Sequence, residues 1–185
     1  ESKTNVQDRD ALEKYNPSNK MTMFIKNINE AGNENSNALY RKIDMGVNTP
    51  DTWVLFEVFK EGLMLSGFME DIGKTDYPSE LSKMENFIVK FFDKFYKLAK
   101  ENKIEIEKTN LDEDDDKEYL SDPTFIMGLL ITCHEYLSTN EINIEAMDKF
   151  LKKFKNTTVN YTYNYPIKQK DRKNMISKFR KLLEG

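Results

Sequence analysis

Few residues of this 185-residue chain have a type and spacing that suit catalysis. Cys133, His134 and Glu135 are adjacent, and a thiol beside the chain's single histidine suggests a nucleophile with its base. Sequence neighbours on a helix point about 100° apart, so two such side chains do not face one another. We therefore interpret His134 as a structural or surface histidine and expect no catalytic dyad.

A run of five acids, residues 112–116, is the second candidate site, because alternate aspartates begin the calcium loop of an EF-hand. Counted from Asp112, the sixth position is Lys117 where that loop needs Gly, and the twelfth is Pro123 where it needs Glu. We expect an exposed acidic loop instead. One Cys and one His also supply too few ligands for a zinc site, so we expect no metal.

The seven glycines form neither a Walker-type phosphate loop nor a dinucleotide fingerprint. No residue set therefore has the form of a catalytic site, and the sequence predicts a protein that is not an enzyme and uses no cofactor.

Apolar residues at spacings of three and four predict that the chain is mostly helix. The clearest stripe runs through Leu81, Met84, Ile88, Phe91, Phe95 and Leu98. Further helices are expected over residues 17–43, 53–72, 123–137, 144–154 and 168–183. The first should break or kink at residues 32–37. The second is apolar on all sides, which is typical of a central buried helix. Ile144, Met147, Phe150, Leu151 and Phe154 should point inward in the penultimate helix.

Proline positions support these boundaries, since Pro is well tolerated at a helix start. Pro17, Pro50, Pro78 and Pro123 are expected to begin helices. The residues Val159, Tyr161, Tyr163 and Tyr165 alternate with polar ones and predict an extended arm. The fold class predicted is all-α: one domain over residues 1–185, built as a bundle of four to five main helices, some kinked or broken.

Charge is distributed unevenly along the chain. Residues 149–185 carry 11 Lys and Arg against 2 acids, whereas residues 1–148 carry 17 against 30. We therefore expect a basic C-terminal region that contacts a protein or an anionic membrane surface. Its contact residues would be Lys168, Lys170, Arg172, Lys173, Lys178, Arg180 and Lys181. The competing interpretation is a solvated outer face on a packed helix.

Nucleic acid is an unlikely partner, because 24 Lys against 4 Arg and an overall pI of about 5.3 disfavour it. An alternative function is a protein-binding module with an apolar groove along the helix that contains Trp53, taking a partner helix. A fully buried helix would exclude that groove.

Abundant Lys and Asn with scarce Arg, as in residues 26–30 and 33–37, resembles proteins of very AT-rich genomes. In composition the chain is similar to the secreted helical-bundle proteins of malaria parasites, which include the sporozoite protein needed for cell traversal. That resemblance implies a secreted or extracellular factor acting at host cells or membranes; a cytoplasmic location is the alternative. No apolar run approaches the roughly 18 residues of a membrane span, so we expect no transmembrane segment.

Overall fold

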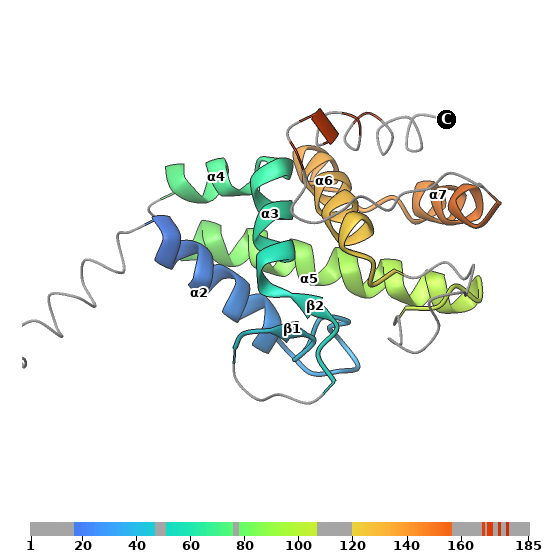
Figure 1. Cartoon of the computed structure of the whole chain (residues 1–185), viewed down its shortest axis with the longest axis horizontal. Helices are drawn as coiled ribbons and strands as arrows, with labels where there is room; N and C mark the ends of the chain where they lie inside the picture. Colours follow the sequence, from blue (N-terminus) through green and yellow to red (C-terminus); the bar gives the residue numbers. More distant parts are fainter. Residues whose placement is uncertain are drawn as a thin grey trace, which may run out of the picture.

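The computed structural model describes residues 17–46, 51–75, 78–106 and 120–156, together with residues 168, 170, 171, 174 and 177. Within this part the chain forms six helices and one two-stranded parallel sheet (Figure 1). The elements in order are α2 (Pro17–Glu30), β1 (Ile43–Asp44), β2 (Val54–Leu55), α3 (Phe56–Ser66), α4 (Phe68–Lys74), α5 (Pro78–Glu101), α6 (Pro123–Thr139) and α7 (Ile144–Asn156). The predicted all-α bundle is confirmed.

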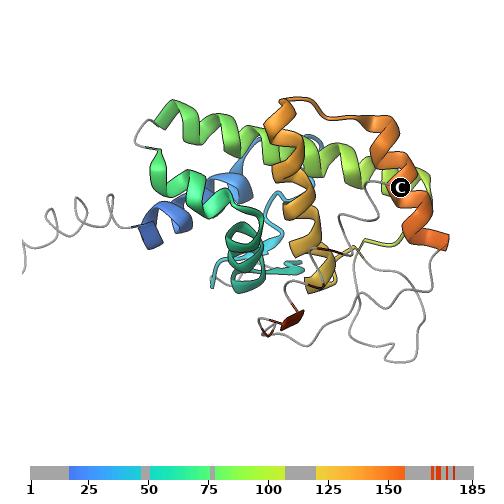
Figure 2. The ribbon, with the colours of Figure 1, turned by 90° about the horizontal axis from the view of Figure 1, so that it is seen from above.

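Helix α5 is the longest element and organises the others around it. Its N-terminal half packs beside α2, α6 crosses its middle, and α7 contacts its C-terminal half (Figures 1 and 2). The predicted apolar stripe of α5 forms this contact surface, with Ile88, Phe91 and Phe95 almost completely buried. The described elements thereby share one hydrophobic core.

Helix α2 ends before the run of residues with poor helix propensity, so the predicted break is confirmed. The expected continuation of the helix to residue 43 is wrong, because turns follow and Ile43 pairs in β1. The side chain of Asn37 closes the end by donating to the carbonyl oxygens of Ile28 at 2.7 Å and Ala31 at 2.9 Å. Asn29 Oδ1 accepts a hydrogen bond from the backbone N–H of Ile43 at 3.0 Å, which fixes β1 against the helix. Two buried amides thus satisfy backbone groups that a continuing helix would have satisfied itself.

The prediction that a helix begins at Pro50 and includes Trp53 is wrong. The backbone N–H groups of Trp53 and Val54 both donate to the carbonyl of Lys42, at 2.9 and 3.0 Å. This draws the residues into a parallel strand pair in which Ile43 faces Val54. The first helical residue is therefore Phe56. The spacing of apolar residues within the segment does not indicate this pairing with Lys42, which makes the helix begin later than predicted.

The expected helix over 53–72 is divided in two. Gly67 adopts φ 97° and ψ −7°, the left-handed region that glycine tolerates, and this ends α3 and starts α4 in a new direction. The all-round burial expected here is also only partly correct. Val58, Phe59 and Leu63 are buried, whereas Leu55 is 55% and Met64 44% exposed within the described residues.

Helices α6 and α7 begin near the predicted positions, α6 at Pro123. In α7, Met147, Phe150 and Leu151 are buried as expected, but Ile144 is 48% exposed because it lies in the first turn, before the helix reaches α5. The side chain of Phe154, the acidic run 112–116 and the predicted arm 159–165 lie outside the described residues. Before the acidic run, Ile104–Ile106 is extended, and Glu105 accepts a backbone hydrogen bond from Leu120 at 3.0 Å.

Candidate binding groove between helices α4, α5 and α6

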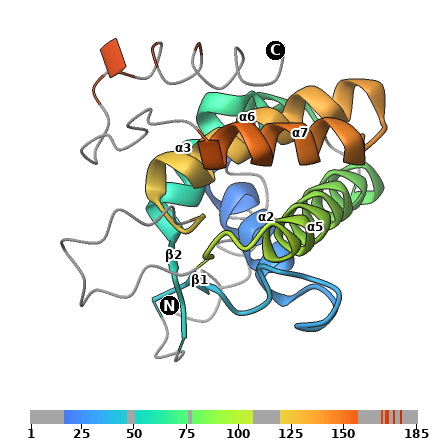
Figure 3. The same ribbon diagram turned by 90° about the vertical axis from the view of Figure 1, so that its right-hand side faces the viewer.

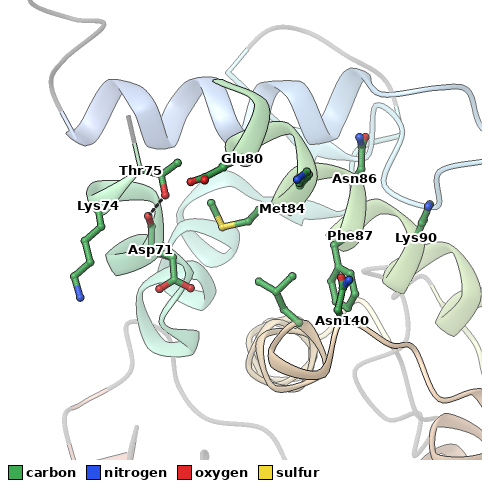
Figure 4. A pocket seen from close by; sticks show the side chains of 11 residues that line it. Asp71, Lys74, Thr75, Glu80, Met84, Asn86, Phe87, Lys90 and Asn140 are labelled. Atoms are coloured by element: carbon green, nitrogen blue, oxygen red, sulfur yellow. Dashed lines mark hydrogen bonds between the residues drawn. The ribbon is translucent and has the colours of Figure 1, made fainter. Parts of the chain in front are cut away.

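A groove with a volume of about 700 Å³ lies where α4, the N-terminal half of α5 and the end of α6 meet (Figure 4). We refer to it as the α4–α5–α6 groove. Its lining residues are Asp71, Lys74, Thr75, Glu80, Lys83, Met84, Asn86, Phe87, Lys90, Leu137 and Asn140. Three separate segments of the chain supply them, so the groove exists only in the folded protein.

The floor of the groove is apolar. Met84 and Phe87 from α5 are 8% and 9% exposed, at the edge of the buried core, and Leu137 from α6 packs half-buried against the same core. In Figure 4, Met84 extends from α5 toward the side on which Asp71 and Thr75 lie. The groove therefore exposes a small apolar strip that no described side chain covers completely.

Charged side chains surround this floor. Lys83 and Lys90 lie two turns apart on α5, both are exposed, and neither has an ion pair among the described residues. Lys74 instead binds Glu70 at 2.8 Å, four residues earlier in α4, and this pair lowers the pKa of Glu70 and raises that of Lys74. Glu80 adds a negative charge at the N-terminus of α5, where the helix dipole favours it. The unpaired lysines make the α5 side of the groove basic.

Helix α4 is attached to α6 by a polar contact. His134 Nε2 lies 2.7 Å from Asp71 Oδ2, and the imidazole packs edge-on against Phe68 with ring centroids 4.8 Å apart. A Cβ placed on Gly67 would lie 3.1 Å from His134 Cε1, so the left-handed glycine lies directly against the ring. His134 therefore holds the break between α3 and α4 in place.

This contact agrees with the interpretation of His134 as a structural histidine and adds the partner that the sequence did not indicate. Cys133 is completely buried, and burial raises the pKa of its thiol well above the usual value. A thiol in that state is a poor nucleophile. The described residues contain no group of three or more His, Cys, Asp or Glu side chains that suits a metal ion.

The predicted basic contact residues do not take part in the groove as far as the structure describes them. Lys168 and Lys170 are exposed, and Asp171 N–H donates to the carbonyl of Lys168 at 2.9 Å. Arg172, Lys173, Lys178, Arg180 and Lys181 lie outside the described residues. Among the described helices, none is long and apolar enough to cross a bilayer.

The groove was missed by sequence reasoning, which placed an apolar groove along the helix containing Trp53. Trp53 precedes α3, and no residue of α3 lines the α4–α5–α6 groove. A partial signal was present in Lys83 and Lys90, whose spacing of seven places two cations on one helix face. The apolar floor gave no separate signal, because Met84 and Phe87 belong to the core stripe of α5.

Comparison with known proteins identified no relative of this chain. The chain matches no family model, no curated protein and no solved structure.

Proposed function

We propose that this chain is a non-catalytic interaction protein whose α4–α5–α6 groove binds a short segment of a partner protein. The segment carries an apolar anchor residue flanked by acidic residues. The observation that carries the proposal is the apolar floor of Met84, Phe87 and Leu137 beside Lys83 and Lys90, which form no ion pair with any residue that the structure describes.

The floor supplies the affinity. Partly exposed apolar side chains at the bottom of a concave surface lose unfavourable contact with water when an anchor covers them. A fully buried aliphatic or aromatic anchor contributes roughly 1.5–3 kcal/mol. The groove volume of about 700 Å³ accommodates one large side chain with its neighbouring backbone.

The lysines supply the selectivity. Lys83 and Lys90 favour acidic residues next to the anchor, and Glu80 disfavours a second acid at the other end. Because these charges are exposed, they increase the rate of association more than the final affinity, and salt screens them.

The test is selection of peptides from a random display library on the folded protein, followed by binding titrations of the enriched peptides. We expect sequences with an aromatic or aliphatic anchor and Asp or Glu nearby. Leu137→Asp should weaken binding about tenfold or more, because it removes an apolar floor contact and repels acidic peptides. Ile144→Asp is the matched control, since Ile144 is an exposed aliphatic residue outside the groove.

A charge-reversal pair tests the selectivity. Lys83→Glu with Lys90→Glu should weaken binding at low salt and much less at high salt, whereas Lys26→Glu on the exposed face of α2 should leave it unchanged. Failure to enrich any peptide, or equal binding by the Leu137 and Ile144 variants, would contradict the proposal.

The predicted contact of the C-terminal region with an anionic membrane is a second proposal, which the exposure of Lys168 and Lys170 supports. Under it, the protein acts at host cells or membranes as a secreted factor, as its composition suggests. Flotation with phosphatidylserine liposomes at low and physiological salt tests it, and replacement of the seven predicted basic residues by Gln should abolish flotation. Absence of binding at both salt concentrations would exclude the membrane version.

A further inference from the structure

A second hollow lies along the C-terminal half of α5, away from the α4–α5–α6 groove. It has a volume of about 780 Å³ and is enclosed by the turns after α2, Trp53, the C-terminal half of α5 and the extended residues 104–106. We refer to it as the Trp53 hollow. Its lining residues are Glu34, Asn35, Asn37, Ala38, Tyr40, Lys42, Trp53, Asp93, Tyr96, Lys97, Lys100, Ile104, Glu105 and Ile106. In Figure 3 the turns after α2 and the strands β1 and β2 lie below α5.

Trp53 Nε1 and Lys42 Nζ are hydrogen-bond donors of this hollow that have no acceptor in the described part of the chain. Trp53 Nε1 is buried without a partner. Lys42 is half-buried, and its Nζ forms neither a hydrogen bond nor an ion pair with the described residues. The two residues are neighbours across the strand pair, since Trp53 N–H donates to the Lys42 carbonyl at 2.9 Å.

A buried donor without an acceptor costs roughly 1–3 kcal/mol, so a ligand that gives Trp53 Nε1 an acceptor removes this cost. A carboxylate suits this pair, because it accepts from an ammonium and from an indole N–H at the same time. Nε1 is covered from solvent, so a side chain of the wall has to shift for the carboxylate to reach it.

The remaining walls favour an aromatic body. Trp53 and Tyr96 pack in a T-shaped arrangement with ring centroids 5.5 Å apart, and Tyr40 and Ile104 add further apolar surface. The Tyr96 hydroxyl does not compete for the ligand, because it already donates to the Leu120 carbonyl at 3.2 Å.

The rim limits the charge of the ligand. Lys97 is bound to Asp93 at 2.9 Å, and Glu34 and Glu105 line the same hollow as Lys42 and Lys100. Three lysines thus meet three acids. This balance gives a polyphosphate no net attraction, whereas a single negative charge needs only Lys42 as its partner.

From this arrangement we propose that the Trp53 hollow binds a small aromatic carboxylate, with the carboxylate accepting hydrogen bonds from Lys42 Nζ and Trp53 Nε1. The site shares no residue with the α4–α5–α6 groove, so this proposal is independent of the proposed function.

The single tryptophan of the chain makes the proposal directly measurable. Titration of the full chain with 3-phenylpropionate should change Trp53 fluorescence in a saturable manner, with a Kd on the order of 1 mM for so small a ligand. The neutral 3-phenylpropionamide has the same body without the charge and should bind about tenfold more weakly.

Lys42→Met keeps the apolar stem of the side chain and removes its charge. It should weaken binding of the carboxylate about tenfold and leave binding of the amide nearly unchanged. Lys26→Met, an exposed lysine on α2, is the control, and circular dichroism verifies that both variants are folded. No saturable change up to about 10 mM, equal affinity for carboxylate and amide, or an unaltered Lys42→Met variant would each overturn the proposal.

Discussion

Two stretches of α6 meet their neighbours in opposite ways. Near its middle, Leu130 and Met127 pack against α3 at Gly62, where an added Cβ would overlap Leu130 Cδ1 and lie 3.3 Å from Met127 Cα. Toward its end, the same helix meets α4 through the side chain of His134 and leaves the α4–α5–α6 groove beside it. A glycine lets two backbones approach closely and closes the contact. A polar side chain bridging two helices leaves room next to it.

The comparison predicts different costs for two similar truncations. Phe59→Ala removes a completely buried ring from α3 and should destabilise the protein by about 3–5 kcal/mol. Phe87→Ala removes a ring at the floor of the groove, where water can enter the space, and should cost clearly less. Urea unfolding measures both free energies of unfolding. Equal losses would show that the groove floor is packed as tightly as the contact between α3 and α6.

Gly67→Ala tests the break that separates the two stretches. Alanine is strained at φ 97°, and its Cβ would approach His134 Cε1 at 3.1 Å, so we expect a loss of about 2 kcal/mol. The histidine resonances in an NMR spectrum should shift as well, because the ring is displaced. An unchanged free energy of unfolding would mean that α3 and α4 can join as one helix.

Gly62→Ala tests the close contact between α3 and α6. The added methyl group forces α3 and α6 apart, which costs about 1–3 kcal/mol and outweighs a gain in helix propensity of at most about 1 kcal/mol. Gly73→Ala in α4 is the matched control, since nothing lies within 4 Å of its added Cβ. That variant should be slightly more stable than the wild-type protein in thermal melts. A stabilised Gly62 variant would refute the close approach.

Glu85→Gln gives the smallest expected effect on stability and changes neither contact of α6. Burial raises the pKa of Glu85, while a hydrogen bond from Asn27 Nδ2 at 3.0 Å opposes the rise. The folded state therefore holds this proton more tightly than the unfolded chain, so stability falls as pH rises from the usual pKa of Glu through the raised value. The Gln variant should lack this decline, which is small because Glu85 is only half-buried and solvent screens its charge. Urea unfolding at several pH values compares the two slopes, and parallel slopes would contradict the shift.

Sequence reasoning succeeded where local patterns decide structure. The stripe of α5 and the helix starts at Pro17, Pro78 and Pro123 were predicted, because periodicity and proline act within a few residues. It failed at Trp53, whose backbone bonds to Lys42 eleven residues earlier. The helix break at Gly67 was not predicted, since the sequence does not show which glycine takes a positive φ.

The candidate site was less predictable than the fold. His134 was singled out for its chemistry, but its partner Asp71 is 63 residues away. The groove floor, Met84 and Phe87 with Leu137, uses residues that any helical pattern assigns to the core. Whether a core residue lies beneath a neighbour or at the bottom of a groove depends on how closely the next helix approaches.

The sequence by itself determined that apolar residues recur at helical spacing and that prolines mark three of the helix starts, because these are properties of neighbouring residues. Only the tertiary structure decided that α4 diverges from α3 at Gly67 and is held by His134. It also decided that Lys42 and Trp53 lie together, with side-chain donors that have no acceptor among the described residues. Such contacts join segments far apart in the chain, and their geometry follows from the packing of all the helices at once.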